Sequence, residues 1–543
     1  MKRFKLFLAM AALACAIGLT VKYGSTYRPV VEPVREIEEI WALEDAREES
    51  GEPLVTRLFC NGIPMAYDAE NNVFYGSLGL ENGAQWPEIK LTASEETAKG
   101  LSLCFADDYG FDDCDAAIRE GYSYQIFAYT DTAYSYAEVV FTGLPLVNVT
   151  ADQTIEREDV PAQIEIALAA EGLQTNGRIH KRGGASILND KVGYKLEFTR
   201  TTDGKKKIYR EIPGMGTDSQ VILLPMNALD TTMMRDRLSW ALYARLTRRD
   251  EPFSARKTQY CELFLNGEYR GVYLMLEPFS VRQEVAKAGE ERLTTDSVYR
   301  TAVISLSHGR PCMEDPYSAA TGFELYYPMD GEPDFSPLTD YFVLLGETDD
   351  AAFMRRAAQI IDLDSALRYD VVLQLFGLTD NVINNMYTWA QNSRGHTRYR
   401  FDFWDLDVSW GLKRDEIGEM HENWVFFPLV DRLLRADEEG GVRKRYGEIY
   451  REVREKAFDT ETVEALVGQY AHELNDSGAM ARNADRWETE NYAADGYELV
   501  AFAAERIALL DEPVRAMSAG EEIDLRFLEK TNYDDKGTPL SEE

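Results

Sequence analysis

The hydrophobic pattern changes along this chain, and that change constrains the fold more than any other feature. Within residues 54–150, short runs alternate apolar and polar residues and are separated by turn residues such as Asn61-Gly62. Alternation with a period of two is typical of half-buried β-strands, so this segment is predicted to be a small all-β sandwich. Beyond Gly411, apolar residues recur at helical spacing instead. The chain is therefore predicted to be an α+β protein with a helical C-terminal part.

Between these two regions, strands and helices are expected to mix. Strands are predicted at residues 164–168, 194–198 and 399–404, and a hairpin at residues 261–276. The Asn266-Gly267 pair favours a tight turn in that hairpin. Helices are predicted at residues 232–246, 364–378, 428–434, 444–458, 460–475 and 499–517.

The N-terminus carries a targeting signal. Lys2, Arg3 and Lys5 precede an uncharged apolar run at residues 6–21. We therefore expect residues 1–22 to be a signal peptide or an N-terminal membrane anchor. The positive charges predict that the body of the protein lies outside the cytoplasm, either membrane-anchored or extracellular. Residues 23–53 are predicted to be an acidic linker and residues 521–543 a polar tail.

The charge of the chain excludes several classes of function. With 94 acidic and 58 basic residues, the formal charge of −36 opposes non-specific binding to nucleic acids and to anionic membranes. Neither a Walker lysine loop nor the Gly-x-Ser-x-Gly or His-Glu-x-x-His signature occurs, so the commonest nucleotidase and hydrolase motifs are absent from the sequence.

Asp380 and Asn385, followed twenty residues later by Asp405, carry groups that phosphoryl transfer requires. That reaction needs a carboxylate to orient or deprotonate the acceptor hydroxyl, and oxygen ligands to hold Mg²⁺ against the phosphates. Protein kinases supply them as an Asp, an Asn five positions later and a second Asp beyond a strand. Asp380 is the predicted catalytic carboxylate, the alternative being a helix cap. Asn385 and Asp405 are predicted metal ligands, and Asp407 shares or replaces the role of Asp405.

Three further segments lie upstream in a recognisable order. They are Arg182-Gly-Gly-Ala-Ser186 ahead of Lys191 and Lys195, Asp230-Thr-Thr-Met-Met-Arg235, and Leu263-Phe-Leu-Asn266-Gly267 continuing to Glu277. Together with residues 380–385 and 404–411, these segments resemble the spore coat protein H (CotH) family of atypical protein kinases. The resemblance runs over roughly residues 164–510.

The resemblance implies an atypical protein-kinase-like domain at residues 151–520. Such a domain would transfer the γ-phosphate of ATP to Ser or Thr of a protein substrate with Mg²⁺ or Mn²⁺. It further implies that Lys191 or Lys195 contacts the phosphates. Arg182 would pair with a phosphate, and Glu277 would orient the lysine or meet the nucleotide, although both residues are equally compatible with an architectural role.

The chain departs from the family pattern around this lysine segment. Asp190 stands where the family usually has Pro, Val192 where it has a second Lys, and Gly184 where it has Asn or Ser. These departures support an alternative function, a catalytically inactive CotH-like protein for adhesion or interaction at the cell surface. Because ATP is scarce outside a cell, an exported kinase would need a compartment that supplies it, such as the space of a spore coat.

Overall fold

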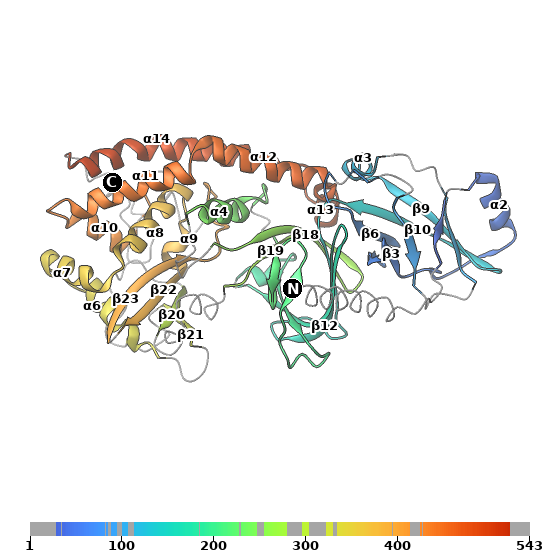
Figure 1. Ribbon diagram of the computed structural model, residues 1–543, viewed down its shortest axis with the longest axis horizontal. Helices are drawn as coiled ribbons and strands as arrows, with labels where there is room; N and C mark the ends of the chain where they lie inside the picture. Colours follow the sequence, from blue (N-terminus) through green and yellow to red (C-terminus); the bar gives the residue numbers. More distant parts are fainter. Residues whose placement is uncertain are drawn as a thin grey trace, which may run out of the picture.

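The computed structural model describes residues 29–33, 35–81, 83–84, 88–94, 100–106, 113–183, 185–226, 230–246, 255–279, 296–302, 322–328, 334–393, 395–412, 424–425 and 427–521. The predicted targeting segment, Gly184 and the polar tail beyond Glu521 lie outside these residues. Helices and strands contribute almost equally, which confirms the α+β class. An N-terminal module, a central barrel and a C-terminal lobe follow one another along the long axis (Figure 1). None of the described helices combines the length and the apolar character that a bilayer crossing requires.

The N-terminal module consists of two sheets around one apolar core. The larger sheet has the order β1 (Val31–Glu32), β8 (Ser102–Phe105), β9 (Ser123–Tyr129), β10 (Ala133–Thr142), β6 (Val73–Ser77) and β5 (Ala66–Asp68), with β2 (Glu48–Glu49) paired to β10. The smaller sheet has the order β4 (Ile63–Pro64), β3 (Leu58–Cys60) and β7 (Leu91–Ala93). Phe74, Ile126 and Val139 are fully buried in the core of this module.

Two helices, α2 (Ile37–Asp45) and α3 (Cys114–Arg119), also belong to the module. The segment interpreted as an acidic linker contributes α2 and the strands β1 and β2. Among the described residues of this segment, Ile40 is fully buried and packs in a cluster with Phe127 of β9. A single apolar anchor in a run of carboxylates is too weak a periodic signal to predict a docked helix.

The central barrel is closed by seven strands around an apolar interior. Their order is β11 (Leu146–Thr150), β12 (Val160–Leu168), β13 (Glu171–Arg182), β14 (Gly193–Thr199), β17 (Gln220–Leu224), β19 (Glu268–Leu276) and β18 (Thr258–Leu265). A short helix, η1 (Ala185–Leu188), follows β13, and a ribbon of β15 (Arg210–Ile212) and β16 (Gly216–Asp218) precedes β17. β11 lies inside the predicted sandwich range but closes the barrel, because it pairs in parallel with β18, more than 100 residues away.

The C-terminal lobe packs helices around a four-stranded antiparallel sheet. The sheet has the order β21 (Phe323–Tyr327), β20 (Ser297–Ala302), β22 (Asn384–Ser393) and β23 (His396–Phe403). The helical elements are α4 (Arg235–Ala244), η5 (Ser336–Leu338), α6 (Thr339–Leu345), α7 (Asp350–Ile360), α8 (Leu363–Phe376), α9 (Asp380–Ile383), α10 (Pro428–Arg435), α11 (Gly441–Lys456), α12 (Thr460–Asp476), α13 (Ala479–Trp487) and α14 (Tyr497–Ala519). The six predicted helices are confirmed.

The helix α8 leads the chain to the candidate site, and local chemistry determines both of its ends. Asp362 caps its first turn by accepting a hydrogen bond from the backbone N–H of Ser365 at 3.1 Å. Gly377 ends it in the left-handed conformation, with φ of 65°. The chain then turns into Asp380 within three residues.

All three parts of the molecule meet at a junction around α13 (Figure 1). Glu262 of β18 is fully buried there, and Arg482 of α13 donates to it from Nε at 2.9 Å and from Nη2 at 2.8 Å. Thr142 of the N-terminal module donates to the carbonyl of Ser477 at 3.2 Å. Gly271 allows α13 to approach β19, since a Cβ at this position would lie 2.5 Å from Asn483 Oδ1.

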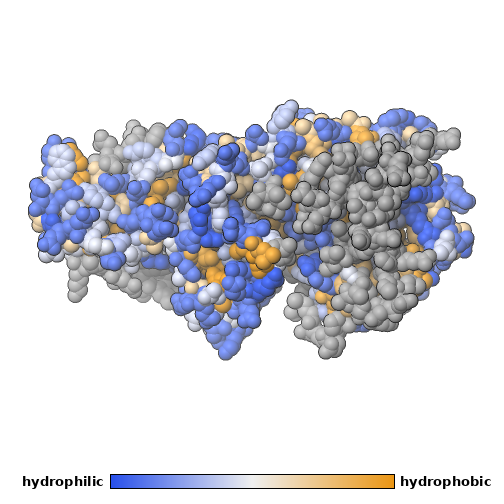
Figure 2. All heavy atoms as spheres, turned by 180° about the vertical axis from the view of Figure 1, so that it is seen from behind, coloured by the Kyte–Doolittle hydropathy of each residue, from blue (hydrophilic) through white to orange (hydrophobic). Residues whose placement is uncertain are grey.

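The surface contrasts with this buried junction. Among the coloured residues of the face shown in Figure 2, hydrophilic side chains predominate and apolar side chains lie in small groups. Among the described residues, the most exposed large apolar side chain is Leu188 in η1, at 87%. Single exposed apolar side chains are ordinary on soluble surfaces and do not by themselves mark a binding site.

Candidate active site

The β22–β23 hairpin brings together residues that lie twenty positions apart in the sequence. Met386 pairs with Phe403 at the open end of this hairpin. One residue beyond this pair, the backbone N–H of Trp404 donates to the carbonyl oxygen of Asn385 at 2.9 Å. Asp405 follows Trp404 directly, so Asn385 and Asp405 lie at the same end of the hairpin.

Asp380 lies in this cluster. Its side chain is 3% exposed. The side-chain amide of Asn385 donates to Oδ2 of Asp380 at 2.7 Å, and that of Asn384 donates to Oδ1 at 3.3 Å. Because Nδ2 of Asn385 is directed at Asp380, Oδ1 is the side-chain atom that Asn385 can offer to a cation. The predicted catalytic residue and one predicted metal ligand are therefore in direct contact.

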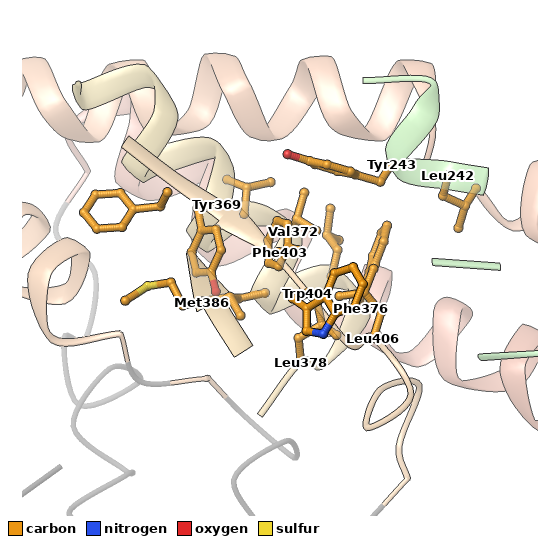
Figure 3. Close-up of a cluster of buried hydrophobic side chains, with 14 of the residues drawn as sticks. Leu242, Tyr243, Tyr369, Val372, Phe376, Leu378, Met386, Phe403, Trp404 and Leu406 are labelled. Atoms are coloured by element: carbon orange, nitrogen blue, oxygen red, sulfur yellow. The ribbon is translucent and has the colours of Figure 1, made fainter. Parts of the chain in front are cut away.

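Asn385 and Asp405 both adopt the left-handed backbone conformation, each with φ of 58°. Asn and Asp tolerate this region better than most residues with a Cβ, and such conformations concentrate at functional sites. Asp405 is held on both sides by its neighbours. Trp404 is 5% exposed and Leu406 is fully buried, and both lie in the hydrophobic cluster with Phe376 and Leu378 (Figure 3). Asp405 and Asp407 are half-buried, in alternation with these apolar anchors.

Asn381 connects the elements of the site, and sequence reasoning missed it. It is fully buried in the one-turn helix α9. Its Nδ2 donates to the carbonyl of Trp404 at 2.7 Å and to that of Asn385 at 3.3 Å. An Asn next to the predicted catalytic Asp was the only sequence signal, and its role depends on the two carbonyls that the hairpin brings together.

Asp236 of α4 is a second residue that the sequence did not single out, and it is acidic. It is 3% exposed, and its Oδ1 is buried without a hydrogen-bond partner. Burial raises the pKa of its carboxyl to about 8, and the charges of Asp405 and Asp230 add to this rise. The backbone N–H of Leu406 and the nearby indole N–H of Trp240 act in the opposite direction. The site therefore contains a buried carboxyl group that lies close enough to Asp405 for the charge of Asp405 to raise its pKa.

Arg235 precedes Asp236 and is architectural. Its Nε donates to the carbonyl of Ser409 at 3.1 Å, and its two terminal nitrogens form ion pairs with Asp230 and Glu498. This buried guanidinium joins the start of α4 to the segment that follows Asp405.

The two candidate phosphate-binding lysines lie in different surroundings. Lys195 of β14 is half-buried and pairs in register with Ile222, which belongs to the core of the C-terminal lobe. Since paired residues project from the same face of a sheet, Lys195 lies on the barrel face turned toward that lobe. Burial lowers the pKa of Lys195, and the charges of Lys207 and Arg182 add to this effect. Arg182 itself lies 5.7 Å from the ring of Trp404.

Lys191, in contrast, is hydrogen-bonded within the junction around α13. Its Nζ donates to the carbonyl of Val272 at 2.6 Å and to Oδ1 of Asn483 at 2.9 Å. Burial lowers the pKa of Lys191 to about 7. The structure thus places Arg182 beside Trp404 at the hairpin end and Lys195 on the barrel face turned toward the C-terminal lobe, whereas Lys191 is tied to α13.

Glu277 lies where the barrel continues into the C-terminal lobe. Its Oε2 accepts the backbone N–H of Lys257 at 3.2 Å, and its own N–H donates to the carbonyl of Lys257 at 2.9 Å. Two residues further on, Phe279 stacks on Tyr387 with ring centroids 4.2 Å apart. In this structure Glu277 is hydrogen-bonded to Lys257 at the end of the β18–β19 strand pair.

The residues present fit a magnesium-type cation. Asp405 and Asn385 supply oxygen atoms, and Asp236 adds a buried oxygen that has no hydrogen-bond partner. Within the described part of the chain, no group of three or more His, Cys, Asp or Glu side chains is arranged to hold a metal ion. Mg²⁺ commonly takes one or two carboxylates and completes its coordination with phosphate oxygens and water.

Comparison with known proteins adds one finding. A family model described as CotH kinase protein matches residues 179–510, which is more than half of the chain. The match begins within β13, ends within α14 and contains every predicted site residue. No curated protein matches the chain.

Proposed function

Because this chain belongs to the CotH kinase family, we propose that it is an atypical protein kinase that phosphorylates Ser or Thr of a protein substrate. The observation that carries the proposal is the end of the β22–β23 hairpin. There Asp380 lies 2.7 Å from the amide nitrogen of Asn385, and Asp405 lies next to the residue that binds the Asn385 carbonyl. A carboxylate and two oxygen donors at one point are the groups that phosphoryl transfer uses.

In the proposed reaction, Asp380 orients the acceptor hydroxyl and accepts its proton. The hydroxyl oxygen forms a bond to the γ-phosphorus of ATP while the bond from that phosphorus to the bridging oxygen breaks, and ADP leaves. Lys195 and Arg182 hold phosphate oxygens from the barrel side. Asn385 and Asp405 would hold Mg²⁺ or Mn²⁺, with Asp407 as their acidic neighbour, and such a cation would supply positive charge against the phosphates.

We further propose that the protein acts outside the cytoplasm, at a cell surface or in a spore coat. The support is the charged and then apolar N-terminal segment in the sequence, together with the family. The acidic charge of the chain favours substrates with basic segments.

An inactive interaction protein is the second candidate. The engagement of Lys191 by Val272 and Asn483 favours it, since this removes one of the two lysines that could contact ATP. A protein that keeps only the fold would bind a partner without transferring phosphate.

Phosphoryl transfer from labelled ATP distinguishes the two candidates. The full chain is incubated with Mg²⁺ or Mn²⁺ and a Ser-rich basic protein, beside Asp380→Ala and Asp405→Ala. We expect Asp380→Ala to lower the rate by about 10²–10⁴-fold, the range for loss of a general base. Equal labelling by the wild type and both variants would refute the assigned site, and no labelling by a folded wild type would favour the interaction protein.

A further inference from the structure

The first turn of α4 is held rigidly against the segment that carries Asp405. Asp230 accepts the hydroxyl of Thr232 at 2.6 Å and the backbone N–H of Arg235 at 3.2 Å. Arg235 in turn donates to the carbonyl of Ser409 at 3.1 Å. This network fixes the position of Asp236, the next residue, relative to Asp405.

Asp236 has the properties expected of a residue that binds a cation. It is 3% exposed, and its Oδ1 has no hydrogen-bond partner. Burying a polar atom without a partner is costly, and a second carboxylate close by increases the cost. A divalent cation between Asp236 and Asp405 would remove both penalties at once.

Asp370 of α8 shows that burial alone does not require a cation. It is 1% exposed, as buried as Asp236. Its Oδ2 accepts the hydroxyl of Tyr446 at 2.8 Å, and its Oδ1 accepts from Nε2 of Gln374 at 3.3 Å. Both of its oxygens are therefore satisfied within the protein, whereas one oxygen of Asp236 is not.

We propose that Asp236 is a further ligand of the divalent cation, which it binds through Oδ1 together with Asp405 and Asn385. The inference rests on the cation site of the proposed function and adds to it a carboxylate from α4. Its consequence is that α4, and the Arg235 network that holds it, determine how tightly the site binds Mg²⁺ or Mn²⁺.

The test measures Mn²⁺ binding to the full chain by calorimetry, with no nucleotide present. Asp236→Asn keeps the shape of the side chain and removes its charge. We expect it to raise the Kd for Mn²⁺ by about tenfold or more, as loss of a metal ligand requires, and to reduce the rise in Tm that Mn²⁺ produces. Asp370→Asn is the matched control and should bind Mn²⁺ as the wild type does.

Wild-type affinity in a folded Asp236→Asn variant would overturn the inference. So would the absence of Mn²⁺ binding by the wild type. If Asp236→Asn does not fold, Asp236→Ser, which is neutral and smaller, is measured in its place with the same expected loss. The proposed function is judged separately: a wild type that binds Mn²⁺ but transfers no phosphate refutes the kinase and leaves the assignment of Asp236 intact.

Discussion

The junction around α13 and the end of the β22–β23 hairpin both bury carboxylates, but they balance the charge differently. At the junction, Glu262 accepts two hydrogen bonds from Arg482 and one from Tyr269 at 2.6 Å. Burial acts to raise the pKa of Glu262, yet the charge of Arg482 and the hydrogen bonds from Arg482, Thr142 and Tyr269 together hold that pKa below its usual value. At the hairpin end, Asp236 lies beside Asp405 with one oxygen unsatisfied.

The difference separates a structural acid from a functional one. An acid whose partners are all within the protein stabilises the arrangement of parts that supplies them, whereas an acid that lacks a partner indicates a missing ligand. The same division applies to the lysines, since Lys191 is hydrogen-bonded at the junction and Lys195 lies on the barrel face turned toward the C-terminal lobe.

Breaking the junction should have the largest effect on stability. Arg482→Met leaves Glu262 buried without its cation, which typically costs about 3–5 kcal/mol of unfolding free energy. Urea unfolding of the full chain measures this loss. Arg515→Met, which removes exposed ion pairs with Glu512 and Glu521, serves as the control and should change little. The double variant Glu262→Gln with Arg482→Met should recover part of the loss, and no recovery would contradict the pairing.

Replacing each of the two lysines by Met in separate variants tests which of them contributes to the reaction and which to stability. Lys195→Met should lower kcat/KM for ATP by about 10–100-fold, as loss of a charged hydrogen bond of about 1.5–3 kcal/mol predicts, with the Tm almost unchanged. Lys191→Met should do the reverse, lowering the Tm and leaving kcat/KM near the wild-type value. Steady-state kinetics and melting curves of both variants check this, and a larger kinetic loss in Lys191→Met would reverse the assignment.

Asp370 is a third buried acid, and it should make the stability of the chain depend on pH. Burial raises the pKa of Asp370 to about 8, although its hydrogen bonds from Tyr446 and Gln374 act in the opposite direction. The folded chain therefore keeps this proton while the unfolded chain loses it near pH 4. Consequently, the stability that Asp370 contributes is complete below that pH and declines as the pH rises to about 8.

Asp370→Asn should flatten this decline by up to about 1.4 kcal/mol per pH unit. Urea unfolding between pH 5 and 8, in buffer without divalent cations, measures the slope, with the exposed Asp131→Asn as the control. A slope equal to that of the wild type would show that Asp370 titrates alike in both states.

The sequence correctly predicted those turns and helices whose signals lie within one short segment of the chain. Asn266 and Gly267 predicted the turn between β18 and β19, and both residues have positive φ, 54° and 77°. The apolar spacing of residues 364–378 predicted α8, which ends one residue before the left-handed Gly377. These signals are complete within about fifteen residues, so no distant partner is needed to interpret them.

Long-range pairing decided what the local signals could not. Residues 146–150 were predicted to belong to the sandwich, but they form β11, which pairs in parallel with β18 and belongs to the barrel. The approach of α4 to the hairpin end placed Asp236 beside Asp405, although 169 positions separate them in the sequence. No periodicity within α4 distinguishes a buried Asp that faces a cation site from one that faces solvent.

Residue types and short spacings were enough to predict the family, the α+β class and the importance of Asp380, Asn385 and Asp405. The fold alone showed that Asn385 and Asp405 lie at one end of a hairpin, that Lys191 is hydrogen-bonded at the junction, and that Asp236 lies close enough to Asp405 to feel its charge. The reason is physical: the charge balance of a buried group depends on neighbours that the fold brings from distant parts of the chain.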